Sequence, residues 1–224
     1  MTATGPSSQG GRRAQPPARV PTGPGPAGQV GLPGRIWLVG MMGSGKTSVG
    51  RALAGLLERP FVDTDQLVED LAGMSVAELF AAEGEEAFRQ REAELIRQLA
   101  EGPAPGVLSV GGGAPGREQN RRVMRSSGAV VWLRATPEVL VRRLGRGEGR
   151  PVLGGPAGPE ALLARVRELV ELRRPWYEDC ADVVLDVGEG LARDVAERVA
   201  EALARRAAAG SVATHGEQGA ATLG

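Results

Sequence analysis

The sequence has one cysteine, one histidine and one lysine among its 224 residues. A single cysteine excludes an internal disulfide framework and a cysteine-based zinc site. The histidine, His215, lies in a tail-like segment of small residues, so we expect neither a Ser-His-Asp nor a Cys-His catalytic system. The lysine is Lys46, and any chemistry that requires a lysine must use this residue.

Excess charge of one sign and long hydrophobic runs are also missing. The 27 basic and 27 acidic residues balance, which argues against a general nucleic-acid-binding or membrane-surface protein. No apolar run approaches the roughly 18 residues of a membrane span, and the N-terminus lacks the hydrophobic stretch of a secretory signal. We therefore expect a cytoplasmic protein with neither nucleic acid nor membrane as a partner, and among oligomeric states we favour a monomer.

The two ends of the chain differ in composition from its middle. Residues 1–34 contain 15 Gly or Pro residues and no acidic residue, so the segment buries too little apolar surface to offset its ordering entropy. We predict that it is a disordered extension, and that the small, polar residues 207–224 form a disordered tail. Residues 35–206 are then expected to form one α/β domain.

Short apolar runs alternate with helical patterns in this middle part. Strands are expected at 35–39, 61–63, 107–110, 129–133 and 183–185. Helices are expected at 46–58, 75–80 and 85–99, from 136 onward, at 159–177 and at 191–203. This alternation predicts βαβ units, and so a three-layer α/β/α fold with a parallel sheet. Ligands bind such sheets at the carboxyl ends of the strands.

A phosphate-binding motif follows the first expected strand. Residues 40–47 read GMMGSGKT, which matches the G-x-x-x-x-G-K-[ST] pattern of a P-loop. The glycines let backbone N–H groups turn toward phosphate oxygens, and the next helix directs its positive end at them. The sequence therefore predicts ATP contacts from Met42, Gly43, Ser44, Gly45, Lys46 and Thr47, with the Thr47 hydroxyl reaching Mg²⁺.

Two carboxylates end the second expected strand, at Asp63 and Asp65. Side chains alternate at a strand end, so one carboxylate can point toward Mg²⁺ and the other into a substrate pocket. The alternative is that Asp65 only caps the following helix. After a P-loop at this spacing, we favour these two roles over simple capping, and the pattern leaves open which carboxylate takes which role.

Four arginines stand out among the 26 in the sequence. Arg89 follows Phe88 on the apolar side of its helix, and Arg173 lies late on the long helix 159–177. Arg150 lies in a Gly- and Pro-rich loop that is a candidate lid over ATP, and Arg143 precedes this loop, where it can contact the nucleotide. Arginine binds carboxylates and phosphates with two parallel hydrogen bonds, although ordinary surface ion pairs are the alternative.

Taken together, these motifs resemble shikimate kinase, a small P-loop kinase of aromatic amino-acid biosynthesis. The resemblance covers about residues 35–205 and rests on motifs in the family's order: GMMGSGKTSVGR at 40–51, DTD at 63–65, FR at 88–89, GGGA at 111–114, RRLGRGEGRPVL at 142–153 and RRPWYEDCAD at 173–182. It implies a five-stranded parallel sheet in the order 2-3-1-4-5. It also implies Mg²⁺-dependent transfer of the ATP γ-phosphoryl group to the 3-hydroxyl of shikimate.

The resemblance also implies roles for individual residues. Thr47 and Asp63 would hold Mg²⁺, and Asp65 would bind the shikimate hydroxyls as the candidate base. Arg89 and Arg173 would bind the shikimate carboxylate, with Arg89 oriented by Glu92. The remaining implied contacts are backbone contacts to shikimate from Gly111, Gly112 and Gly113, a phosphate contact from Arg150 and an adenine contact from Arg143.

Three other functions compete with this interpretation. A gluconate-type P-loop kinase would share the phosphate site but would lack the paired arginines for a carboxylate on a ring. A GTP-binding switch would need an [NT]-K-x-D motif, which a chain with one lysine cannot supply. A non-catalytic P-loop scaffold would not need Lys46, Asp63, Asp65 and Arg150 together.

Overall fold

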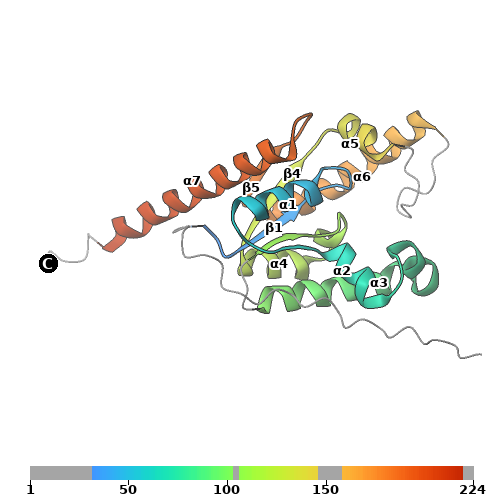
Figure 1. Ribbon diagram of the computed structural model, residues 1–224, viewed down its shortest axis with the longest axis horizontal. Coiled ribbons are helices and arrows are strands. Elements are labelled where there is room, and N and C mark those ends of the chain that lie inside the picture. Colours follow the sequence, from blue (N-terminus) through green and yellow to red (C-terminus); the bar gives the residue numbers. More distant parts are fainter. Residues whose placement is uncertain (1–31, 103–105, 146–157, 219–224) are drawn as a thin grey trace, which may run out of the picture.

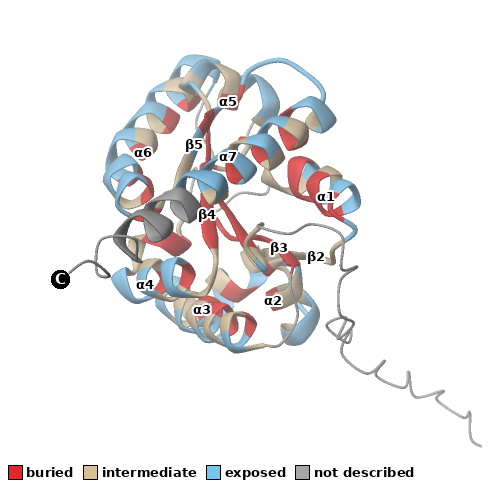
Figure 2. Ribbon diagram, turned by 90° about the vertical axis from the view of Figure 1, so that its left-hand side faces the viewer, coloured by how far each residue is buried: buried red, intermediate tan, exposed pale blue. Residues whose placement is uncertain are grey.

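The computed structural model describes residues 32–102, 106–145 and 158–218, and for residues 210–218 it describes the backbone alone. Five parallel strands form one sheet in the order β2-β3-β1-β4-β5, as predicted. The strands are β1 (Arg35–Val39), β2 (Phe61–Asp63), β3 (Gly106–Ser109), β4 (Ala129–Arg134) and β5 (Val183–Asp186). Helices cover both faces of the sheet (Figure 2), which is the three-layer fold expected from the sequence.

The helices follow the strands in alternation. They are α1 (Lys46–Leu56), α2 (Thr64–Ala72), α3 (Val76–Glu101), α4 (Glu118–Ser127), α5 (Pro137–Leu144), α6 (Pro159–Cys180) and α7 (Ala192–Gln218), with a short 3₁₀ helix at Ala114–Gly116. α3 contains a kink at Gly84, where φ is 84°. The two helices expected at 75–80 and 85–99 therefore join at this glycine.

Side-chain hydrogen bonds mark several helix starts that the sequence indicates. Ser75 and Glu78 form the capping box before α3: the Ser75 side chain accepts from the Glu78 N–H, and the Glu78 carboxylate accepts from the Ser75 N–H. Thr136 caps α5 through the N–H of Val139.

The sequence does not predict α4, because most of its residues are arginine or other polar residues. Only Val123 and Met124 of this helix are apolar residues that pack in the core.

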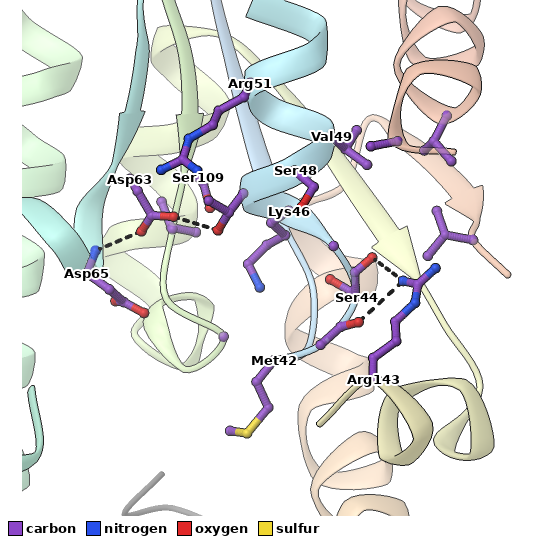
Figure 3. Close-up of a pocket in the computed structure, with 18 of the residues that line it drawn as sticks. Met42, Ser44, Lys46, Ser48, Val49, Arg51, Asp63, Asp65, Ser109 and Arg143 are labelled. Carbon is purple, nitrogen blue, oxygen red and sulfur yellow. Dashed lines mark hydrogen bonds between the residues drawn. The ribbon is translucent and has the colours of Figure 1, made fainter. Parts of the chain in front are cut away.

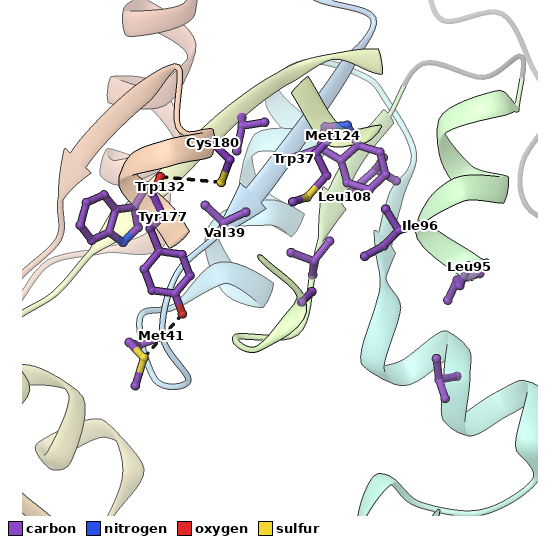
Figure 4. Close-up of a cluster of buried hydrophobic side chains, with 14 of the residues drawn as sticks. Trp37, Val39, Met41, Leu95, Ile96, Leu108, Met124, Trp132, Tyr177 and Cys180 are labelled. Atoms are coloured by element: carbon purple, nitrogen blue, oxygen red, sulfur yellow. Dashed lines mark hydrogen bonds between the residues drawn. The ribbon is translucent and has the colours of Figure 1, made fainter. Parts of the chain in front are cut away.

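Alternate side chains of the central strand β1 point to opposite faces of the sheet. Trp37 and Val39 pack in one apolar cluster with residues of α3, α4 and α6, part of which Figure 4 shows. Ile36 and Leu38 pack in the other cluster with residues of α1 and α7. All four side chains have no exposed surface, so β1 is the buried centre from which the phosphate loop emerges.

The last helix is longer than the sequence led us to expect. α7 continues to Gln218 and projects from the rest of the molecule (Figure 1), so the predicted domain boundary at 206 falls within a helix. Alanine is the strongest helix former, and Ala207–Ala209 carry the helix across that boundary. Of residues 1–34, predicted to be a disordered extension, 1–31 lie outside the described residues, whereas Leu32 packs against the core.

Candidate active site

The carboxyl ends of the five strands meet at one edge of the sheet, where the candidate residues gather. The P-loop follows β1, Asp63 ends β2, and the glycines 111–113 follow β3. A cavity of about 730 Å³ opens at this edge, lined among others by Gly43–Thr47, Asp63, Asp65, Gly112 and Arg143. Residues predicted from distant parts of the sequence are thus brought together around one cavity (Figure 3).

The P-loop depends on glycine for its backbone conformation. Gly40, Gly43 and Gly45 have φ values of 141°, 79° and 95°, which side-chain-bearing residues rarely adopt. Lys46 Nζ donates to the carbonyls of Gly40 at 2.8 Å and Met41 at 3.0 Å. These two bonds hold the ammonium group against the loop. In P-loop proteins, phosphates bind at the mouth of this loop.

Arg143 closes the cradle from α5. Its Nη1 atom donates to the carbonyl of Ser44 at 3.0 Å and to that of Gly43 at 3.3 Å, and its Nη2 atom donates to the carbonyl of Gly188 beyond β5. The side chain therefore joins the P-loop to the segment after β5, which also contributes Val187, Gly190 and Leu191 to the cavity wall. The sequence predicted Arg143 beside the nucleotide, but it gave no sign of the bond to Gly188.

Asp63 and Asp65 occupy different places. The Thr47 hydroxyl donates to Asp63 Oδ2 at 2.8 Å, and the Asp65 N–H donates to Asp63 Oδ1 at 3.2 Å. Asp63 is thus the N-cap of α2, so the capping role that we considered for Asp65 belongs to Asp63. The Asp65 side chain reaches toward Gly111 instead: a Cβ added at Gly111 would lie 2.7 Å from Asp65 Oδ1.

A cluster of buried and half-buried charges surrounds the glycines after β3. A Cβ at Gly111 would lie 2.3 Å from Glu92 Oε1, one at Gly112 would lie 3.2 Å from Arg173 Nη1, and one at Gly113 would lie 2.4 Å from Arg89 Nη2. A methyl group at any of the three positions would therefore crowd a charged side chain. The absence of side chains at 111–113 is what lets Asp65, Glu92 and the two arginines approach this loop.

Arg89 and Arg173 differ in how they are paired. Arg89 Nη1 forms an ion pair with Glu92 Oε2 at 2.8 Å, and Nη2 forms a second with Glu85 Oε1 at 3.2 Å. Arg173 is 5% exposed, and within the described residues its Nε atom is buried without a hydrogen-bond partner. A buried guanidinium with an unused donor is costly, so this position suits an anionic ligand.

Burial shifts the pKa values of the two carboxyls beside the glycine loop. It raises the pKa of Asp65, and the nearby charge of Asp63 raises it further, whereas Lys46 and Arg89 oppose the shift. Glu92 is fully buried, and burial raises its pKa to about 7 against the pull of Arg89. A raised pKa at a cleft makes a carboxyl more basic, as a general base requires.

Three further residues are Arg150, Cys180 and Tyr177. Arg150 lies outside the described residues, so its predicted role in a lid stays a prediction. Cys180 is 1% exposed and burial raises the pKa of its thiol to about 11, so it is a residue of the core. Tyr177, which we assigned no role from the sequence, donates from its hydroxyl to the Gly112 carbonyl at 2.7 Å.

Comparison with known proteins decides between the kinase families. The family model described as shikimate kinase matches residues 42–204, most of the chain. The chain belongs to the shikimate kinase family. A shikimate kinase of Symbiobacterium thermophilum is 49% identical over 76% of this chain and 97% of its own length. One of Cereibacter sphaeroides is 46% identical over 76% of this chain and 83% of its own length.

Solved structures agree with this family assignment. A shikimate kinase of Acinetobacter baumannii in complex with shikimate superposes with a TM-score of 0.73 at 36% identity, over 78% of this chain and 94% of that chain. A gluconokinase of Sinorhizobium meliloti superposes with a TM-score of 0.53 at 24% identity, over 82% of this chain and 99% of that chain. At that identity the gluconokinase shares the fold alone.

Proposed function

We propose that the chain phosphorylates shikimate, transferring the γ-phosphoryl group of ATP to the 3-hydroxyl to give shikimate 3-phosphate and ADP. Membership of the shikimate kinase family supports the reaction. The structural observation that carries the substrate class is the buried, unused Nε donor of Arg173 beside Arg89. Two guanidinium groups beside Gly112 and Gly113, next to the P-loop, fit an acceptor that bears a carboxylate.

The residues of the phosphate half would position ATP for transfer. Phosphoryl transfer depends on positioning and charge neutralisation more than on covalent catalysis. Lys46 would exchange its bonds to the carbonyls of Gly40 and Met41 for bonds to phosphate oxygens. Arg143, already bonded to the P-loop, would flank the nucleotide, and the family resemblance implies that Arg150 contacts the transferred phosphoryl group.

Asp65 would act on the acceptor. Its half-buried carboxylate lies between the P-loop lysine and the glycine loop, where both Lys46 and Arg89 act on its charge. It would accept the hydrogen bond, and then the proton, of the 3-hydroxyl as the oxygen attacks phosphorus. Backbone groups of 111–113 would contact the sugar-like ring, which a side chain at these positions would displace.

The site also fits Mg²⁺ supplied with ATP. Thr47 Oγ1 and Asp63 Oδ2 lie 2.8 Å apart and offer the hydroxyl and carboxylate oxygens that Mg²⁺ takes as ligands. No group of three or more His, Cys, Asp or Glu in the described part of the chain is arranged to hold a metal by itself. The bound ion would neutralise charge on the phosphate oxygens, and Thr47 and Asp63 would hold it.

We also propose that the enzyme works as a cytoplasmic monomer with ATP and shikimate as its partners. The balanced charge of the chain supports the absence of a nucleic-acid partner. Among the helices of the described ranges, none has the length and apolar character needed to cross a membrane.

Replacing Arg173 by alanine tests the carboxylate assignment. We expect Arg173→Ala to raise the KM for shikimate by about two orders of magnitude, since a buried charged hydrogen-bond partner is lost, while the affinity for Mg-ADP stays within twofold. Arg174→Ala is the matched control, because Arg174 is the next residue of α6 and pairs with Glu171 at the surface. Equal losses of shikimate and Mg-ADP affinity in Arg173→Ala would contradict the assignment.

A further inference from the structure

The only tyrosine of the chain lies beneath the glycine loop rather than in the cavity. Tyr177 is 1% exposed, on α6 one turn after Arg173. Its ring packs against that of Trp132 with centroids 5.4 Å apart. Its hydroxyl points to the other end, toward Met41 of the P-loop (Figure 4), with 3.5 Å between the oxygen and the Met41 sulfur.

The hydroxyl of Tyr177 holds one peptide group of the glycine loop. It donates to the carbonyl of Gly112 at 2.7 Å. Because a peptide group is planar, fixing this carbonyl also fixes the direction of the Gly113 N–H. Loops of glycine have many accessible backbone conformations, so a buried hydrogen bond at the middle glycine removes freedom that the loop would otherwise have.

Gly112 is also the point at which three parts of the site meet. A Cβ placed there would lie 3.2 Å from Arg173 Nη1, 3.3 Å from the Gly40 carbonyl and 3.3 Å from the Met42 nitrogen. The glycine loop, the α6 arginine and the P-loop are thus in contact around one residue. A shift of Gly112 would move the acceptor groups relative to the phosphate cradle.

We propose that Tyr177 is a positioning residue, which orients Gly112 and Arg173 against the P-loop and thereby sets the affinity for the acceptor. The inference rests on the proposed function and assigns this residue a part in it. Burial raises the pKa of the phenol to about 12, so the hydroxyl keeps its proton and donates across the pH range of ordinary enzymes.

Tyr177→Phe removes the hydroxyl and keeps the ring that packs on Trp132. We expect the KM for shikimate to rise about tenfold, the size expected for one buried hydrogen bond, with the KM for Mg-ATP within twofold. Cys180→Ala is the matched control: Cys180 is equally buried on α6, packs in the same apolar cluster and donates from its thiol to the Tyr177 carbonyl. The control should lower Tm and leave both KM values unchanged.

The KM and Tm values of the variants distinguish a positioning role of Tyr177 from a role in packing alone. If Tyr177→Phe lowers Tm but leaves the KM for shikimate unchanged, or raises both KM values equally, the inference is overturned. If the wild-type protein releases no ADP with shikimate, the proposed function fails instead, and this is seen before any variant is made.

If the Tyr177→Phe variant does not fold, a measurement on the wild-type protein tests the same proposal. Because the chain has one tyrosine, a 13Cζ-tyrosine label gives a single resonance from Tyr177. Saturating shikimate should shift this resonance more than saturating Mg-ADP does, since the phenol is bonded to the acceptor loop. A resonance that shikimate leaves in place would contradict the positioning role.

Discussion

Glu92 is fully buried among the charges that line the acceptor end of the site. Its Oε2 atom pairs with Arg89, while Oε1 lies over Gly111 and has no hydrogen-bond partner within the described residues. Asp65, Arg173 and Glu85 complete the charged surroundings of this pair. The cost of burying the carboxylate exceeds the attraction of the arginines, which is why its pKa rises to about 7.

Glu92 should therefore make stability depend on pH. Its pKa is raised from the ordinary 4.5 to about 7 on folding, so its contribution to stability is full below about pH 4.5 and is lost as pH rises through 7. Glu92→Gln cannot ionise and keeps an oxygen that accepts from Arg89. We expect the Tm of the wild type minus that of Glu92→Gln to fall between pH 5 and pH 8. A difference that stays constant across this range would contradict the raised pKa.

At the scale of the element, two glycines of α1 have opposite surroundings. A Cβ at Gly50 would lie 2.3 Å from Phe61 Cε2 and 3.1 Å from Leu38 Cδ1, whereas one at Gly55 would meet nothing within 4 Å. Gly50 thus lets α1 approach β1 and β2 closely. Gly55 is an exposed helical residue at which no close contact requires a glycine.

The two alanine substitutions should move stability in opposite directions. Gly50→Ala overpacks the contact between α1 and the sheet and should cost about 1–3 kcal/mol of unfolding free energy. Gly55→Ala removes a glycine from an exposed helix and should add up to about 1 kcal/mol. Urea unfolding of both variants measures this, and destabilisation by Gly55→Ala or none by Gly50→Ala would contradict the packing described.

The elements that sequence predicted best are those with local chemical signals. Apolar runs located all five strands, and the capping residues Ser75 and Thr136 located helix starts, because these signals depend on neighbouring residues. α4 gave no such signal: two of its arginines, Arg121 and Arg125, pair with the distant Asp179. The end of α7 was also missed, since small residues fit both a helix and a tail.

Within the site, sequence predicted residue types but not how they contact one another. The motifs named Arg89, Arg173 and the glycines 111–113, and the structure brings them together. The bond from Tyr177 to Gly112 joins residues 65 positions apart, and the bond from Arg143 to Gly188 joins residues 45 positions apart. Such contacts depend on the assembled sheet, so local pattern cannot predict them.

At the scale of the whole molecule, the order of the strands places the two substrates. β1 lies between β3 and β4, so the P-loop lies beside the glycine loop at the centre of the edge. Asp63 and Asp65 come from β2 and α2 on one side, and the segment after β5 closes the other. ATP and a carboxylated acceptor can thus meet over β1 and β3.

The N-terminal boundary of the folded unit can be tested with two deletions that differ by three residues. Leu32 packs against the core, and the Pro33 carbonyl accepts from Arg59 Nη1. A variant lacking residues 1–30 should keep the Tm and activity of the full chain within error. A variant lacking residues 1–33 should have a lower Tm, because both contacts are lost. A clear loss in the shorter deletion would contradict the predicted disordered extension.

The most direct test of the account is ADP release by the purified full-length protein with Mg-ATP. It is measured with shikimate, gluconate or quinate and without an acceptor. The account predicts sustained ADP release with shikimate and only background release with gluconate, as membership of the shikimate kinase family implies. No stimulation by shikimate, in a protein that still binds Mg-ATP, would contradict the central claim while leaving the P-loop fold intact.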